Sequence, residues 1–167
     1  MFERLNTPEE VFSFKLGAAL KMENTILEML SELDEHAQRE ELKQSIRQHA
    51  QETRHHVSNL EQSFRLLGEE VDDSPCPAID GLQSEGKATI KKADESVVDI
   101  VILSGIVETE HHEIAVYENL IAAAEARGAG EVATLLRENL HSEQQTLERA
   151  KHSSEQVLRE GTTVASG

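Results

Sequence analysis

Apolar residues recur three or four positions apart along most of this chain, which is the spacing of one face of an α-helix. The pattern predicts four long helices, at about 8–33, 36–67, 93–127 and 131–159. A shorter amphipathic helix is expected at about 78–91. The chain therefore alternates long helical segments with few and short connections.

Capping and linker signals support these boundaries. Thr7 followed three residues later by Glu10 forms a capping-box pattern, and Gly68 suits the end of the second helix. The acidic, proline-containing linker 69–77 is the natural crossover between two helical hairpins. Segment 97–107 is rich in β-branched residues, but the helical period continues through it and no other segment offers a partner strand. The sequence predicts an all-α fold, a ferritin-like four-helix bundle with a crossover and one short extra helix.

Glutamates interrupt the apolar stripes near the middle of the long helices. Glu23, Glu110 and Glu143 stand within stripes, while Glu52 lies on the flank of its stripe, one turn from His56. A buried carboxylate without a partner is costly, and several at one level would repel each other. Divalent cations remove this cost, and oxygen ligands with little imidazole suit iron or manganese better than zinc.

These observations predict a site for two Fe or Mn ions, to which the helix at about 93–127 adds a second carboxylate, Glu113. Its expected ligands are Glu23, Glu52, His56, Glu110, Glu113 and Glu143. The alternative is an acidic bundle whose glutamates are solvated on helix surfaces.

The remaining histidines and one threonine qualify this prediction. His55 points away from its stripe, and His49 falls on the flank of His56 as a candidate outer group; whether either joins the site is left open. Thr146 occupies the position where a second Glu-x-x-His pair would place its histidine. The expected centre is therefore richer in carboxylate than that pattern.

Length and charge limit the function classes. A chain of 167 residues suits one domain, expected at 1–160, with a disordered tail at 161–167. A net charge of −16 argues against binding of nucleic acid or anionic membranes. The single cysteine, Cys76, and the lack of a signal-peptide pattern or long apolar run predict a cytoplasmic protein.

Several segments together resemble the bacterial YciE/YciF-like family of small ferritin-like, stress-associated proteins. They are TPEEVFSFKLGAALKMENTIL, QETRHHVSNLEQSFRLLG, CPAIDGLQSEG, VETEHHEIAVYENL and LLRENLHSEQQTL, in order over almost the whole chain. The resemblance implies a di-metal site at Glu23, Glu52, Glu110 with Glu113, and Glu143. His56 falls where the family often has histidine or glutamine. The sequence departs from the family at Ala18 and Leu20, where an aspartate and a tyrosine are frequent.

Two functions are compatible with these features. The first is a di-iron or di-manganese protein that reacts with dioxygen or peroxide, with Tyr117 as a candidate hydrogen-bond or electron donor. The second is a non-enzymatic stress protein that acts through dimerisation or partner binding, with a structural or vacant metal site. A homodimer is expected in either case, and iron storage is a weaker third reading. Whether the site is catalytic stays open.

Overall fold

The structure, a computed structural model, describes residues 4–164 and consists there of helices and connecting turns. The five helices, in chain order, are α1 (Pro8–His36), α2 (Glu40–Leu67), α3 (Pro77–Ile90), α4 (Val98–Ala126) and α5 (Gly130–Val164). The all-α prediction is confirmed, because no strand occurs within the described range.

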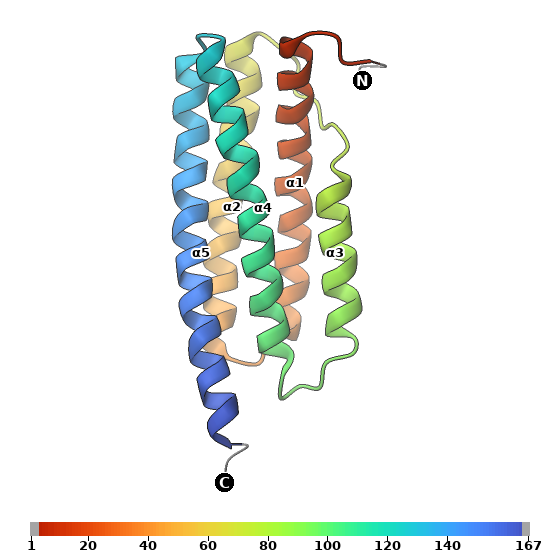
Figure 1. Cartoon of the computed structure of the whole chain (residues 1–167), viewed down its shortest axis with the longest axis vertical. Helices are drawn as coiled ribbons and strands as arrows, with labels where there is room; N and C mark the ends of the chain where they lie inside the picture. The colour runs from red at the N-terminus through yellow and green to blue at the C-terminus, as the bar shows by residue number, and fades with distance from the viewer. Residues whose placement is uncertain (1–3, 165–167) are drawn as a thin grey trace.

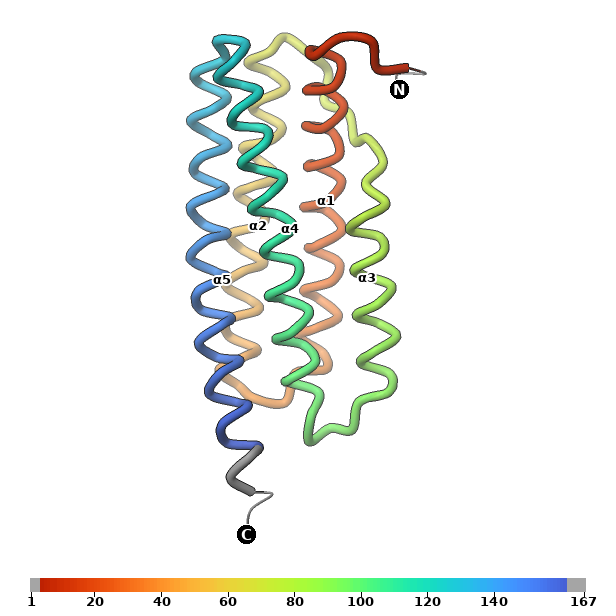
Figure 2. The backbone as a smooth tube through the Cα atoms, viewed as in Figure 1, coloured from red at the N-terminus to blue at the C-terminus, as the bar shows by residue number. Residues whose placement is uncertain are grey.

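The four long helices lie side by side along the length of the molecule, and α3 lies outside them (Figure 1). Contacts join α1 to α2, α2 to α5, α5 to α4 and α4 to α1, so the four close a ring around a shared interior. The tube in Figure 2 shows that α1 and α2 run antiparallel, as do α4 and α5. The crossover runs the length of the bundle between α2 and α4, and it contains α3, which packs against α1 and α4. This is the predicted bundle with a crossover and one short extra helix.

The helix ends show why the sequence stops each helix where it does. The Thr7 hydroxyl accepts a hydrogen bond from the Glu10 backbone N–H at 3.1 Å, and the Glu10 carboxylate accepts one from the Thr7 N–H at 3.2 Å. Gly68 ends α2 with a φ of 71°, in the left-handed region that favours glycine. Both ends agree with the capping signals in the sequence.

Two boundaries differ from the sequence prediction because of contacts between distant residues. Helix α2 begins at Glu40 rather than near residue 36, since Asp99 of α4 accepts hydrogen bonds from the backbone N–H groups of Gln38 and Arg39, at 2.8 and 3.1 Å. Helix α5 continues past residue 159 to Val164, and Arg39 holds this extension through an ion pair of 2.6 Å with Glu160.

The C-terminal end of α5 overlaps the disordered tail predicted at 161–167. Residues 161–164 belong to α5, while 165–167 lie outside the described residues. The division into a domain and a disordered tail stays a prediction.

The hydrophobic part of the interior is built mainly from aliphatic side chains. Segment 97–107 contributes Ile102, Leu103 and Ile106 to this core, but Ser104 is exposed and Ile100 is half-buried beneath α3. Part of the outer face of this segment is apolar because α3 packs over it. None of the described helices is both long enough and apolar enough to cross a membrane.

Candidate metal centre

Six buried side chains from the four long helices come together inside the ring. One group of mutually close ligand atoms comes from His49, Glu110, Glu113 and Glu143, and a second comes from Glu23, His56 and Glu143. Within each group the ligand atoms lie within 4.8 Å of one another. Because Glu143 belongs to both groups, the two groups are adjacent and share one carboxylate, and each could hold a cation.

Helix α1 contributes Glu23, which is fully buried. One carboxylate oxygen accepts a hydrogen bond from the Tyr117 hydroxyl, and the other has no hydrogen-bond partner. Burial raises the pKa of Glu23, and contact with His56 only partly opposes this rise. Without a cation nearby, this carboxyl therefore tends to keep its proton.

Helix α2 contributes two histidines seven residues apart, hence on one face two turns apart. His49 Nε2 lies 2.9 Å from a Glu110 oxygen. His56 Nδ1 lies 2.7 Å from a Glu143 oxygen and 3.6 Å from a Glu23 oxygen. Burial by itself would lower the pKa of both imidazoles, but the neighbouring carboxylates outweigh it and raise the pKa of each to about 10.

Helices α4 and α5 contribute two further buried carboxyls with raised pKa values, Glu113 and Glu143. Burial, with the negative charges of Glu143 and Glu110, raises the pKa of Glu113 well above its ordinary value. Burial likewise raises the pKa of Glu143, although His56 opposes the rise. Neither oxygen of Glu113 or Glu143 has a hydrogen-bond partner, so the 2.7 Å contact of Glu143 with His56 is not aligned as a hydrogen bond.

These unpartnered atoms test whether the residues fit a metal. Buried polar atoms in folded proteins almost always have a partner, so a cluster that lacks partners calls for an explanation. The unpartnered buried ligand atoms are Glu23 Oε2, His49 Nδ1, His56 Nδ1, Glu110 Oε2 and both oxygens of Glu113 and Glu143. Two divalent cations would balance four carboxylates and give these lone pairs a partner. The donor set, rich in oxygen with two imidazoles, fits iron or manganese.

A buried hydrogen-bonded chain supports the second group from outside. Asn139 donates to the Tyr117 hydroxyl at 3.0 Å and to the His56 backbone carbonyl at 3.2 Å. Asn59 in turn donates to the Asn139 side-chain oxygen at 2.8 Å. These bonds fix the orientation of Tyr117, and through it the position of the Glu23 carboxylate.

The structure places Glu52 beside the cluster, and neither group contains it. Its side chain is 24% exposed and lies 2.7 Å from the Arg149 guanidinium, and it accepts a hydrogen bond from the Thr146 hydroxyl at 3.2 Å. Burial would raise the pKa of Glu52, but contacts with His49, Gln48 and Arg149 lower it to about 2. Glu52 is therefore an ionised carboxylate held at the edge of the site, 3.9 Å from His49 Nδ1.

The structure brings together most of the predicted metal ligands and adds one histidine that was not among them. Of the six predicted ligands, five come together and Glu52 stands apart, while His49, whose part in the site the sequence left open, belongs to the first group. His55 is exposed and near Glu138, away from the site. The inward stripe of α2 is partly polar: Leu42, Ile46, His49, Thr53, His56, Leu60 and Ser63. The seven-residue spacing of His49 and His56 was the signal that could have identified both.

The sequence and fold match known proteins over nearly the whole chain. A family model described as "Domain of unknown function (DUF892)" matches residues 7–163. Protein YciF of Escherichia coli K12 is 28% identical over 144 residues, covering 85% of this chain and 87% of that protein. The resemblance to YciE/YciF-like proteins inferred from the sequence is thus confirmed.

Solved structures agree on the architecture. YcfI from Rhodopseudomonas palustris superposes with a TM-score of 0.87 at 33% identity, covering 90% of this chain and 98% of that one. The crystal structure of the E. coli stress protein YciF gives a TM-score of 0.87 at 25% identity, covering 93% and 99%.

Proposed function

The chain belongs to the family described as domain of unknown function DUF892, and from this premise we propose that it binds two iron or manganese ions in a carboxylate-rich centre that reacts with dioxygen or peroxide. The observation that carries the proposal is the pair of buried ligand groups that share Glu143. The interior of most helical bundles is apolar. This concentration of carboxylate oxygens and imidazole nitrogens without partners is therefore best explained by a bound ligand.

The two groups divide the ligands between the ions. His49, Glu110 and Glu113 would hold one ion, Glu23 and His56 would hold the other, and Glu143 would contact both. Bound iron or manganese supplies Lewis acidity and redox chemistry toward dioxygen or peroxide.

The surrounding residues then have definite tasks. Tyr117 holds one oxygen of Glu23, which leaves the other oxygen for the ion. Arg149 and Thr146 hold Glu52 near His49, where it is a further carboxylate that could act as a ligand at the edge of the site. Because the pKa values of Glu23, Glu113, Glu143 and the two imidazoles are raised in the folded chain, binding of cations should release protons.

The physiological setting follows from the relatives. E. coli YciF is described as a stress protein, and we extend that role to this chain. A cytoplasmic location and a homodimer complete the proposal.

Elemental analysis tests the metal site most directly. The protein is purified without chelator or histidine tag, reconstituted anaerobically with Fe(II) or Mn(II), and passed through a desalting column. About two ions per chain are expected in the native protein, and few in the Glu110→Ala/Glu143→Ala variant. The matched control is Glu118→Ala/Glu148→Ala, which removes two exposed glutamates from the same helices. Absence of bound metal in the native protein, or equal content in both variants, would refute the site.

One observation favours the alternative, a non-enzymatic bundle with a structural or vacant site. The contacts of His49 with Glu110 and of His56 with Glu143 let protonated imidazoles neutralise two carboxylates without any metal. In that case chelation leaves the melting temperature and the consumption of peroxide unchanged. A fall in both on chelation supports the di-metal function.

A further inference from the structure

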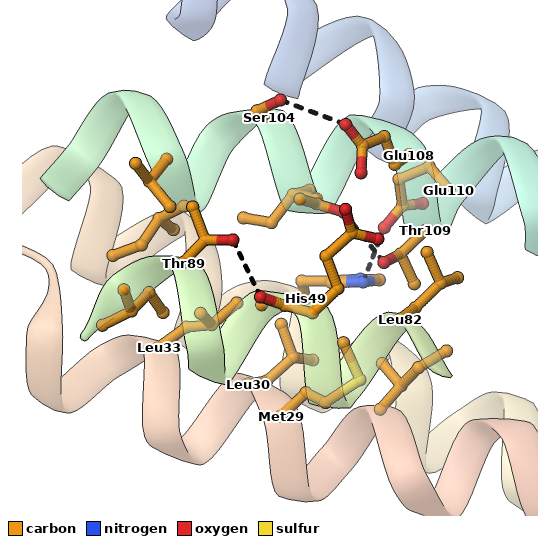
Figure 3. A pocket seen from close by; sticks show the side chains of 18 of the residues that line it. Met29, Leu30, Leu33, His49, Leu82, Thr89, Ser104, Glu108, Thr109 and Glu110 are labelled. Atoms are coloured by element: carbon orange, nitrogen blue, oxygen red, sulfur yellow. Dashed lines mark hydrogen bonds and ion pairs between the residues drawn. The ribbon is translucent and has the colours of Figure 1, made fainter. Parts of the chain in front are cut away.

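A cavity of about 330 Å³ lies between α1, α3 and α4 and ends at the metal centre. Figure 3 shows His49 and Glu110 at one side of it, joined by their ion pair, with aliphatic side chains around the remaining space. The volume falls in the range of roughly 300–1,000 Å³ that is typical of small-molecule sites. Both polar residues at its inner end belong to the first ligand group.

The cavity walls are mainly aliphatic. Its apolar lining includes Ile26, Met29, Leu30, Leu82, Ile90 and Ile106. The cavity is open at its rim, and the aliphatic part of its walls is suited to an occupant with an apolar chain.

Two glycines keep the space open. Gly86 in α3 and Gly105 in α4 both line the cavity, although glycine inside a helix costs stability relative to alanine. A Cβ atom added at either position would meet no other atom within 4 Å. Neither glycine is therefore needed for close helix packing, and each leaves volume that a larger side chain would occupy.

The charges around the cavity select the kind of occupant. The exposed lining residues are Glu85, Thr89, Ser104 and Glu108, and the Ser104 hydroxyl donates to Glu108 at 3.2 Å. No lysine or arginine is among the described residues that line it; Lys87 and Lys91 border a neighbouring cavity instead. Glu85 and Glu108 at the rim disfavour the entry of an anionic ligand, while at the inner end the charge of Glu110 is paired with His49.

We propose that this cavity binds an uncharged molecule with a single alkyl chain, such as a medium-chain alcohol or aldehyde, which lies beneath α3 with one end beside His49 and Glu110. The aliphatic walls accommodate the chain, and the acidic rim excludes its carboxylate counterpart. The proposal rests on the proposed function only in placing the ligand next to a metal centre. Binding itself needs no metal.

Calorimetric titration with 1-octanol tests the proposal on the full chain, both metal-free and loaded with Mn(II). Saturable binding of one molecule per chain is expected, with octanoate binding more weakly. Gly105→Leu and Gly86→Leu fill the cavity and should weaken octanol binding by about tenfold or more. Gly81→Leu is the matched control, because Gly81 lies in α3 but does not line the cavity, and it should bind like the native chain.

Further variants and controls separate the outcomes. The Glu85→Gln/Glu108→Gln variant lacks the two rim carboxylates, so its affinities for octanol and octanoate should differ less than those of the native chain. Absence of saturable octanol binding would overturn the proposal, as would equal octanol binding by the Gly105→Leu, Gly86→Leu and Gly81→Leu chains. Sedimentation of the native chain would also overturn it if it showed that a second copy fills the cavity. Circular dichroism establishes that each variant is folded. Metal content is measured on the same samples, so that loss of the metal site and loss of octanol binding are scored independently.

Discussion

Helix α4 separates two interiors of opposite character. Its inner face presents Glu110, Glu113 and Tyr117 to the ring of four helices, where several buried polar atoms lack a hydrogen-bond partner. Its outer face presents Ile100 and Gly105 to the space beneath α3, where aliphatic walls surround a cavity. One interior lacks partners for its charges, and the other lacks atoms to fill its volume.

This difference shows that two kinds of incomplete interior can point to ligands. Unpartnered carboxylates call for cations, because only positive charge or protons compensate them in a low-dielectric interior. Unfilled apolar volume calls for an apolar group, because dispersion contacts are missing there. His49 and Glu110 border both interiors, so a molecule in the cavity would lie against the metal ligands.

The largest expected effect is on the polar interior. Mn(II) at about a hundred times its dissociation constant should stabilise the native chain by about 2.7 kcal/mol for each ion bound, because cations bind the assembled ligands only in the folded state. Glu143→Ala removes the carboxylate that both groups share, so its melting temperature should not respond to Mn(II). Thermal unfolding followed by circular dichroism measures this effect.

The control for that experiment is Glu148→Ala, an exposed position on the same helix. It should keep the full rise in melting temperature. An equal rise in the Glu143→Ala chain would show that the ions bind elsewhere.

The stability of the metal-free chain should fall as pH rises, and bound metal should remove this pH dependence. In the metal-free chain the pKa of His49 and of His56 is raised to about 10, so the folded state holds more protons than the unfolded state between pH 6.5 and 10. Stability is then fully present below the ordinary histidine pKa and falls as pH rises through this window, by up to about 1.4 kcal/mol per pH unit for each histidine. The raised pKa values of Glu23, Glu113 and Glu143 act in the same direction from about pH 4.5 upward.

Metal-loaded protein should instead keep a nearly constant stability across this window, since bound cations displace these protons and the unfolded histidines have lost theirs above their ordinary pKa. Urea unfolding across the window, with EDTA or with Mn(II), measures both slopes. The His49→Gln/His56→Gln chain should show a flatter metal-free slope. Metal-free stability that increases with pH would contradict the assigned direction.

A smaller effect is expected when one carboxylate of the polar interior is replaced by an apolar side chain. Glu113→Leu removes two unpartnered buried oxygens and should stabilise the metal-free chain by about 1–3 kcal/mol, while it lowers the metal content. Glu118→Leu, at an exposed position of α4, is the control and should change stability by less than about 0.5 kcal/mol. Denaturant unfolding and elemental analysis give the two readouts, and a destabilised metal-free Glu113→Leu chain would contradict this account of the site.

The two interiors also differ in how far the sequence predicts them. Glu23, Glu110 and Glu143 are recognisable because each stands alone among apolar residues at helical spacing. The inward face of α2 is harder to locate from the sequence. The apolar residues Ala50 and Val57 indicate a face centred on themselves, but they are half-buried, and the histidines next to them, His49 and His56, are the buried residues.

The remaining features depend on contacts that no local pattern contains. The partner of Glu52, Arg149, lies 97 positions away in the sequence. The cavity beneath α3 depends on how α3 packs across α1 and α4, and a volume without atoms leaves no periodicity to read.

The smallest expected effect concerns the apolar interior and separates it from the polar one. Gly105→Ala places a methyl group where nothing lies within 4 Å, so no clash opposes the higher helix propensity of alanine. The chain should gain about 0.5–1 kcal/mol in its free energy of unfolding, with unchanged metal content. Denaturant unfolding of metal-free protein measures this gain. Gly17→Ala is the contrasting variant and should lose stability, since its Cβ would approach Ser74 Oγ to 2.7 Å and the Asp72 carbonyl oxygen to 2.9 Å. If Gly105→Ala also destabilises the chain, the space beneath α3 is already filled by neighbouring side chains, and the contrast between the two faces of α4 is lost.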